Sequence, residues 1–165
     1  MKYNIIKKLS YLLFSFALIV SFVSCDQEES IADPSSIVTE AVRGTWVVDM
    51  TWDGSFYDHN TINTYNTSSL ADNEIWIDDL KHGWGLKAKV NFDLGTLTFS
   101  ASSADELYYG VTVNVTEGKI IKGGATAPSG DVVDSIYFKV EFSDIPGEIW
   151  EYSGYKSTAK IEDLP

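Results

Sequence analysis

The chain has 165 residues, with 24 acidic and 12 basic side chains and a formal net charge of −12. A charge this negative repels nucleic acid and anionic lipid headgroups, which excludes nucleic acid as a partner. Cys25 is the only cysteine, so no intrachain disulfide can form.

The first 24 residues have the layout of a secretory signal. Lys2, Lys7 and Lys8 form a short basic region, and an almost unbroken apolar run extends from Leu9 to Val23. This run of about 15 residues is shorter than the roughly 20 that a membrane-spanning helix needs. We therefore predict that residues 1–24 are an export signal that is removed from the mature protein.

Cys25 directly follows this signal. The segment Phe22-Val23-Ser24-Cys25 resembles a bacterial lipobox, although Phe22 replaces the usual aliphatic residue. The thiol of such a cysteine takes a thioether-linked diacylglycerol, and two or more acyl chains hold a protein stably on a membrane. We predict lipidation at Cys25, which makes the membrane a partner. The alternative is an unmodified free cysteine.

Residues 25–40 are predicted to be a flexible acidic tether, because they are polar, carry Pro34 and lack periodicity. The stretch Asp26 to Glu29 resembles the acidic signal that directs some Bacteroidota lipoproteins to the cell surface. The expected location is the outer membrane, at either the cell surface or the periplasmic face. Loss of the signal would remove three lysines and leave 9 basic against 24 acidic residues, a net charge of −15.

Residues 41–165 are predicted to form a single all-β domain, because apolar and polar residues alternate with period two. Strands with one buried face are expected at residues 45–52, 84–92, 96–101, 111–116, 136–143 and 150–153, with shorter candidates at 74–78 and 119–122. No segment of ten or more residues has convincing helical periodicity. Residues 101–107 could form one short turn of helix.

Turn residues separate the expected strands. Hairpin connections are predicted at Asp93-Leu94-Gly95 and Glu117-Gly118, and further loops at Gly123-Gly124, Pro128-Ser129-Gly130 and Pro146-Gly147. The polar segment 53–73 is expected to be a long loop, either a lid or an ordinary hairpin loop. About eight strands with short connections must bury a shared apolar face. We predict an antiparallel, up-and-down, lipocalin-like barrel, with a β-sandwich as the alternative.

Aromatic side chains are the strongest indication of a binding site. The candidates for lining a ligand cavity are Trp84, Phe92, Phe138, Trp150 and Tyr152. Aromatic rings also dominate hydrophobic cores, so the alternative is that these rings only fill the barrel, as we expect for Trp46. Because aromatic rings stack on sugars, a carbohydrate ligand is a further alternative.

The sequence offers little catalytic chemistry. The Gly-x-Ser-x-Gly motif of α/β-hydrolases is absent. His59 and His82 are both predicted in polar loops, with Asp58 or Asp78 and Asp79 nearby in sequence, so a Ser–His–Asp arrangement would depend on geometry alone. A zinc site would need ligands beyond these carboxylates and His82. We predict no catalytic residue, no metal ion and no cofactor.

Gly44-Thr45-Trp46 opens the first expected strand and resembles the start of lipocalin and wider calycin barrels, in which the Trp packs at the closed end. Together with the segments 73–79, 84–90 and 152–156, it is similar to the Bacteroidota family called lipid-binding putative hydrolases, over residues 41–156. The resemblance implies a calycin-like barrel and a lipid or other hydrophobic ligand. It transfers no catalytic residue.

Three functions follow as hypotheses. The first is a membrane-anchored, monomeric lipoprotein whose barrel binds a lipid or other small hydrophobic ligand. The second is a lipid or ester hydrolase with His59 or His82 as its base. The third is a surface accessory or carbohydrate-binding lipoprotein whose barrel is filled by its own side chains.

Overall fold

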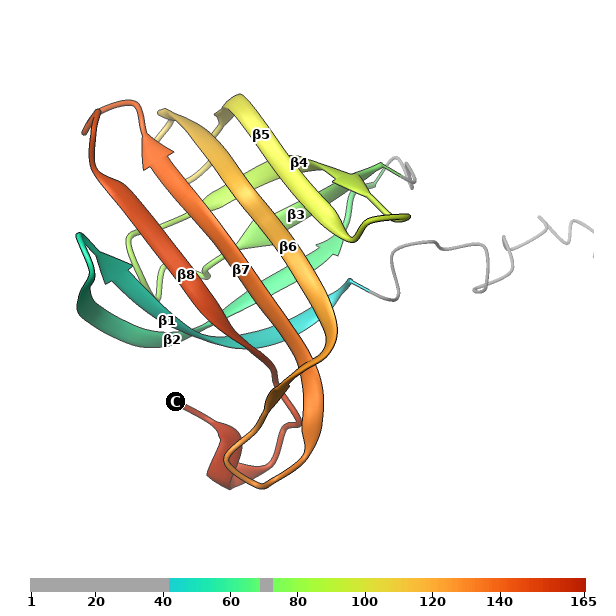
Figure 1. The fold of residues 1–165 in the computed structure, drawn as a ribbon. Helices are drawn as coiled ribbons and strands as arrows, with labels where there is room; N and C mark the ends of the chain where they lie inside the picture. Colours follow the sequence, from blue (N-terminus) through green and yellow to red (C-terminus); the bar gives the residue numbers. More distant parts are fainter. Residues whose placement is uncertain (1–41, 69–72) are drawn as a thin grey trace, which may run out of the picture. The chain divides into compact units, whose positions relative to one another are not determined.

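The computed structural model describes residues 42–68 and 73–165 (Figure 1). The strands are β1 (Gly44–Trp52), β2 (Ser55–Asn66), β3 (Glu74–Asp78), β4 (Lys87–Asp93), β5 (Thr98–Asp105), β6 (Thr112–Thr126), β7 (Val132–Phe142) and β8 (Ile149–Lys156), followed by the 3-10 helix η3 (Ile161–Asp163). The predicted signal at 1–24, the tether at 25–40 and Cys25 lie outside the described residues. Within the described ranges, no helix has the length and hydropathy of a membrane span.

The strands form one closed barrel. Each strand pairs antiparallel with the next one in the chain, and β8 pairs with β1 to complete the ring. Short turns favour this order, because a tight connection can join only antiparallel neighbours. The prediction of an all-β, up-and-down antiparallel barrel is confirmed, and the sandwich alternative is wrong.

The two ends of the barrel carry different segments. Strands β1, β3, β5 and β7 finish at one end, which carries the connections 53–54, 79–86, 106–111 and 143–148. We call this end the mouth. The opposite end, where β1 begins and β8 finishes, is called the base.

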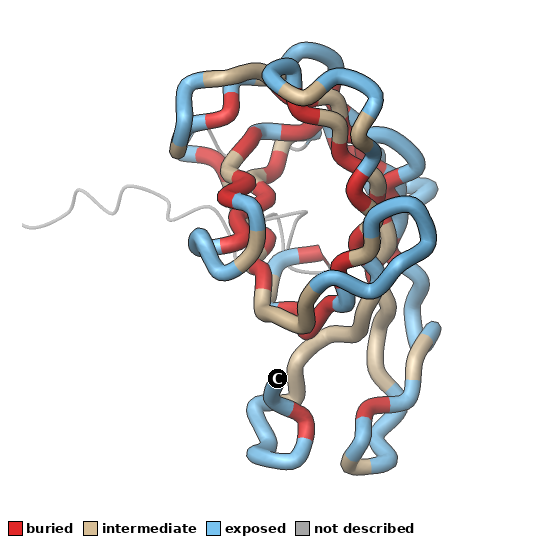
Figure 2. The backbone as a smooth tube through the Cα atoms, turned by 90° about the vertical axis from the view of Figure 1, so that its left-hand side faces the viewer, coloured by how far each residue is buried: buried red, intermediate tan, exposed pale blue. Residues whose placement is uncertain are grey.

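Alternate side chains of the strands point inward, and buried residues line the ring of strands (Figure 2). Trp46 lies near the base and is fully buried. Its Nε1 donates a hydrogen bond of 2.8 Å to Oγ1 of Thr64, and the Lys156 ammonium lies 5.8 Å from the centroid of its ring. The predicted core position of Trp46 is confirmed.

The prediction of a long loop over residues 53–73 is wrong for residues 55–66, which form β2. Only Ile62 and Thr64 of this strand are buried, and its first half is half-buried or exposed beside the mouth. Period-two alternation therefore does not mark it. Its Thr and Tyr residues nevertheless favour extended backbone, and His59 lies on this strand rather than in a loop.

The prediction of two strands joined by a hairpin at Glu117-Gly118 is also wrong, because β6 runs through this point. Glu117 has a φ of 55°, and the register with β7 shifts here, which are the properties of a β-bulge. A Cβ at Gly118 would lie 2.4 Å from the carbonyl oxygen of Phe99. Glycine and a residue with positive φ occur both in tight turns and in bulges of this type, so Glu117-Gly118 is compatible with either.

Smaller differences occur at three other segments. Gly123-Gly124 lies within β6, beside a second register shift, and is not a loop. Residues 101–105 continue β5 as extended strand, so the predicted turn of helix does not form there. Trp84 precedes β4, which begins only at Lys87, because the chain bends before it enters the sheet.

Candidate functional site

Exposed apolar side chains gather at the mouth. Of the thirteen large hydrophobic side chains that are exposed in the described residues, eight lie on the mouth connections or on adjoining strand residues: Trp52, Phe56, Tyr57, Leu80, Trp84, Leu107, Tyr109 and Ile149. We call these eight the apolar rim. Beside the rim, a hollow of about 400 Å³ is lined by Trp52, Gly54 and Ile149 together with charged residues that include Lys139 and Glu151. Exposed apolar side chains concentrated in this way mark a surface for a ligand or a partner.

Trp150 of β8 is the centre of an aromatic cluster just inside the rim. Its ring stacks with that of Trp84 at a centroid distance of 5.3 Å and with that of Trp52 at 6.2 Å. Tyr57 meets it edge-on at 4.9 Å. Trp84 is 37% exposed and Trp150 only 3%, so the cluster leads from solvent into the barrel.

A second group of rings lies deeper. Tyr152 stacks on Phe138 with centroids 4.7 Å apart, and Phe138 contacts Phe99 at 5.7 Å. Both Tyr152 and Phe138 are fully buried. The fold thus brings Trp84 and Trp150 together at the mouth, and Phe138 and Tyr152 together in the interior. Phe92 is buried on β4, where it pairs with Phe99 of β5. Ligand contact by these residues stays a prediction.

Two buried polar atoms in this region have no hydrogen-bond partner among the described residues. They are Nε1 of Trp150 and the hydroxyl oxygen of Tyr152. Leaving a buried polar group unpaired costs about 1–3 kcal/mol, and folded proteins satisfy nearly all such groups. The two atoms are therefore polar positions that a ligand or an ordered water would satisfy in an otherwise apolar interior.

The segment 79–86, which we call the mouth loop, folds into the barrel entrance. A Cβ at Gly83 would lie 2.5 Å from Sδ of Met50, which is fully buried on β1. A Cβ at Gly85, whose φ is 92°, would lie 2.4 Å from the ring of Tyr109. Glycine lets the backbone approach both side chains closely. The mouth loop therefore covers the interior below Trp84.

Asp79 holds the mouth loop in its shape. Its fully buried carboxylate accepts hydrogen bonds from the backbone N–H groups of Lys81 at 2.9 Å and Gly85 at 2.8 Å. The Asp79 N–H donates in turn to the carbonyl of Leu86 at 2.8 Å, which joins the two ends of the loop. Burial raises the pKa of Asp79, and these backbone hydrogen bonds oppose that effect only in part.

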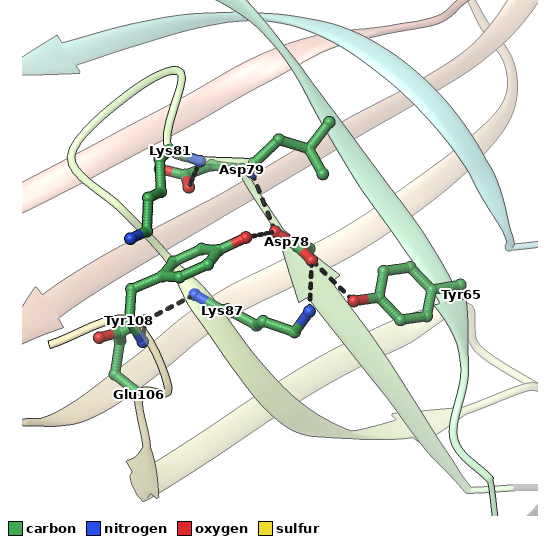
Figure 3. Close-up of polar contacts among 8 residues, drawn as sticks. Tyr65, Asp78, Asp79, Lys81, Lys87, Glu106 and Tyr108 are labelled. Atoms are coloured by element: carbon green, nitrogen blue, oxygen red, sulfur yellow. Dashed lines mark hydrogen bonds and ion pairs between the residues drawn. The ribbon is translucent and has the colours of Figure 1, made fainter. Parts of the chain in front are cut away.

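Asp78 anchors the adjoining segments from outside the core (Figure 3). Its carboxylate, almost fully buried, pairs with the Lys87 ammonium at 2.9 Å and accepts hydrogen bonds from the hydroxyls of Tyr65 at 2.7 Å and Tyr108 at 2.5 Å. The backbone N–H of Leu80 donates to the same carboxylate at 2.9 Å. One side chain thus joins β2, β3, β4 and the two connections at 79–86 and 106–111.

The pKa values of Asp78 and Tyr108 in this network lie far from neutral pH. Burial alone would raise the pKa of Asp78, but hydrogen bonds from Tyr108, Lys87 and Tyr65 outweigh it and lower the pKa to about 2. Burial and the hydrogen bond to Asp78 raise the pKa of Tyr108 to about 12. A general base or acid works best with a pKa near the operating pH. The network is therefore a structural support for the mouth rather than an acid–base centre.

Glu106 fixes the other mouth connection, 106–111. Its buried carboxylate accepts hydrogen bonds from the backbone N–H groups of Lys87 at 3.0 Å, Tyr108 at 2.8 Å and Tyr109 at 2.8 Å. The ring of Tyr109 is thereby held against Gly85 of the mouth loop. The two connections support each other, and both depend on buried carboxylates.

The histidines lie on the outer side of this arrangement. His59 Nδ1 lies 2.6 Å from the carboxylate of Asp49, and both side chains are more than one-third exposed. Ser153 pairs with Asp49 from the opposite neighbouring strand, so the carboxylate stands between the histidine and the serine, whereas in a triad the histidine stands between the other two. His82 Nδ1 lies 3.2 Å from Oγ1 of Thr61, also at an exposed position.

Sequence reasoning weighed Asp78, Asp79 and His82 as metal ligands but did not find their structural role. No group of three or more His, Cys, Asp or Glu side chains within residues 42–68 and 73–165 is placed to hold a metal ion. Tyr65, Lys87, Glu106 and Tyr108 were not predicted as site residues. A usable signal was the acidic pair Asp78-Asp79 at the end of the strand Glu74–Asp78, because two adjacent carboxylates at a strand end need buried partners or solvent.

A larger hollow of about 670 Å³ lies toward the base, along β4, β5 and the bulge of β6. Phe92 and Phe99 contribute to its wall, but most of its lining is polar, including Asp93, Glu117 and Lys119. Its Phe99 contacts the buried ring of Phe138, but neither of the two unpartnered buried polar atoms of the described residues belongs to its lining, and it has no exposed rings like those of the rim. The mouth is therefore the better candidate for a hydrophobic ligand.

Comparison with known proteins identifies the family of this chain. A family model described as lipid-binding putative hydrolase matches residues 32–160. No curated protein matches the chain. A solved structure from Bacteroides ovatus, a structural genomics protein of unknown function, is similar at 12% identity and a TM-score of 0.47. The match covers 73% of this chain and 43% of that one, so the chain spans less than half the length of that protein.

Proposed function

We propose that this chain, which belongs to the lipid-binding putative hydrolase family, binds a lipid or other small hydrophobic ligand through the mouth of its barrel. The observation that carries the proposal is the pair of ring groups, with the exposed Trp84 stacked on Trp150 at the mouth and the buried Tyr152 stacked on Phe138 in the interior. When a ligand covers the apolar rim, apolar surface is removed from water. This burial contributes about 25 cal/mol of free energy per Å². Pockets of this kind combine apolar walls with a few polar groups.

Entry of a ligand would require the mouth loop to move, because Gly83 lies against Met50 in the entrance. The loop is built to move as one unit, since Asp79 ties its two ends together. Its links to β2 are few and exposed: Asn60 Nδ2 donates to the carbonyl of His82 at 2.8 Å, and Thr61 contacts the His82 ring. Exposed hydrogen bonds of this type contribute little to stability, so the cost of opening lies mainly in the packing of Trp84 on Trp150 and of Gly83 on Met50.

Ligand binding is tested with the purified barrel domain, residues 41–165. Native mass spectrometry after mild extraction should detect a co-purifying hydrophobic molecule, and the dye N-phenyl-1-naphthylamine should gain fluorescence on binding. Trp84→Ala should weaken dye binding about tenfold, because it removes a ring from the entrance. Trp76→Ala, which changes a half-buried ring on the outer face of β3, is the matched control and should leave dye binding unchanged. No bound lipid and no dye signal would contradict the proposal.

We further propose that the protein is a monomeric lipoprotein of the outer membrane, held through a diacylglycerol on Cys25. The signal layout of residues 1–24 and the acidic tether at 25–40 support this. Cys25→Ser should release the barrel into the soluble fraction, whereas Ser30→Ala should leave it in the membrane. Fractionation and metabolic labelling with palmitate measure both. Unchanged membrane association of Cys25→Ser would remove the anchor from the proposal.

A further inference from the structure

The buried charged side chains in the described part of the chain are all of one sign. Among residues 42–68 and 73–165, the buried charged side chains are Asp78, Asp79, Glu106 and Asp163. No lysine, arginine or histidine of these ranges is buried. A ligand with an ionised carboxylate would therefore enter the barrel without a buried counter-charge, and an unpaired charge in an apolar interior is strongly disfavoured.

The unpartnered atoms inside the mouth are hydrogen-bond donors. Nε1 of Trp150 can only donate, and the hydroxyl of Tyr152 can donate or accept. The two residues are i and i+2 on β8, so both point to the same side of the strand, into the barrel. Two donors on the same face of one strand suit the oxygens of an ester, hydroxyl or ketone group.

The surroundings of Tyr152 favour an uncharged acceptor. Burial raises the pKa of its hydroxyl well above the usual range, and the negative charge of Asp79 acts in the same direction. The hydroxyl is therefore protonated and free to donate at neutral pH. The Asp79 carboxylate already accepts hydrogen bonds from Lys81 and Gly85, and its charge would repel a second carboxylate placed at Tyr152.

We propose that the barrel selects an uncharged lipid with an ester, ketone or alcohol oxygen, which accepts hydrogen bonds from Trp150 Nε1 and the Tyr152 hydroxyl, and that it rejects ionised fatty acids. This inference rests on the proposed lipid-binding function and adds the class of ligand. Burial of the acyl chain would provide the binding affinity, and the polar group would determine which lipids bind.

The test uses three probes of matched chain length, delivered from cyclodextrin at pH 7.4. They are 9,10-dibromostearic acid, its methyl ester and 9,10-dibromooctadecane, each of which quenches tryptophan fluorescence on contact. The ester should bind at least tenfold more tightly than the acid and several-fold more tightly than the hydrocarbon. If none of the three quenches, the proposed function fails. If the acid binds as tightly as the ester, lipid binding stands and the selection of uncharged lipids is wrong.

A pair of tyrosine variants on β8 tests the polar contact. Tyr152→Phe keeps the ring that stacks on Phe138 and removes only the unpartnered hydroxyl. It should lower ester affinity several-fold and leave hydrocarbon affinity unchanged. Tyr155→Phe is the matched control, because the Tyr155 hydroxyl already donates to the carbonyl of Asp163, and it should change neither affinity. An ester preference that survives Tyr152→Phe in full would remove this hydroxyl from recognition.

Discussion

Asp78→Ala should lower the free energy of unfolding by about 3–5 kcal/mol, which is the usual cost of removing one partner of a buried ion pair. The change leaves the Lys87 ammonium without its carboxylate and removes the acceptor of the Tyr65 and Tyr108 hydroxyls. Because these groups connect β2, β4 and the 106–111 connection, the mouth should loosen together with the fold. Urea denaturation followed by tryptophan fluorescence measures the effect.

The matched control for this variant lies on the same two strands. Glu74 of β3 faces Lys89 of β4 at 3.7 Å, and both side chains are about one-third exposed or more. Glu74→Ala should cost no more than about 1 kcal/mol, as is usual for exposed ion pairs. Equal losses in the two variants would show that burial of the Asp78 network contributes nothing beyond an exposed pair.

The same network predicts how stability depends on pH. The pKa of Asp78 is lowered from 3.8 to about 2 in the folded protein, so the stability it contributes is present above pH 3.8 and is lost as the pH falls through about 2. A shift of this size corresponds to about 2 kcal/mol. Asp78→Asn should reduce the loss of stability between pH 5 and 2 by that amount. An unchanged acid transition in Asp78→Asn would contradict the lowered pKa.

Gly154→Ala should prevent the barrel from closing. A Cβ at this position of β8 would lie 1.9 Å from the carbonyl oxygen of Val47 and 2.7 Å from Cα of Val48. Both are backbone atoms of β1, so no side-chain rotation can relieve the contact, and the strands that close the ring must separate. We expect a loss of more than 4 kcal/mol or no folded protein, because overpacking against backbone belongs to the most damaging substitutions.

Near-ultraviolet circular dichroism and thermal unfolding measure the outcome for Gly154→Ala. Ser153→Ala is the control, since Ser153 is the preceding residue on the same strand and its side chain is exposed. It should fold with wild-type stability within about 0.5 kcal/mol. A Gly154→Ala barrel with unchanged stability would show that β1 and β8 can shift apart without cost.

How far the fold could be predicted depended on where each strand buries its side chains. Residues 136–142 alternate strictly because one face lies in the core, and residues 45–52 alternate except at the buried Val47, so the sequence predicts both as strands. β2 carries few buried residues, so its sequence predicts a loop instead of a strand. The bulge at Glu117 is not distinguishable from a turn by sequence, because a positive φ followed by glycine is compatible with both.

The sequence by itself determined that this is an acidic, all-β chain. It also indicated the family, which the match over residues 32–160 confirms. The export signal and the lipidation of Cys25 stay predictions. These properties are local, since period-two alternation, turn residues and short motifs need no knowledge of distant contacts. Only the tertiary structure decided the site. Trp84 and Trp150 stack although 66 residues separate them, and Asp78 binds Tyr108 across 30. Such contacts arise when the ring of strands closes and places the connections of one end together, which no short stretch of sequence encodes.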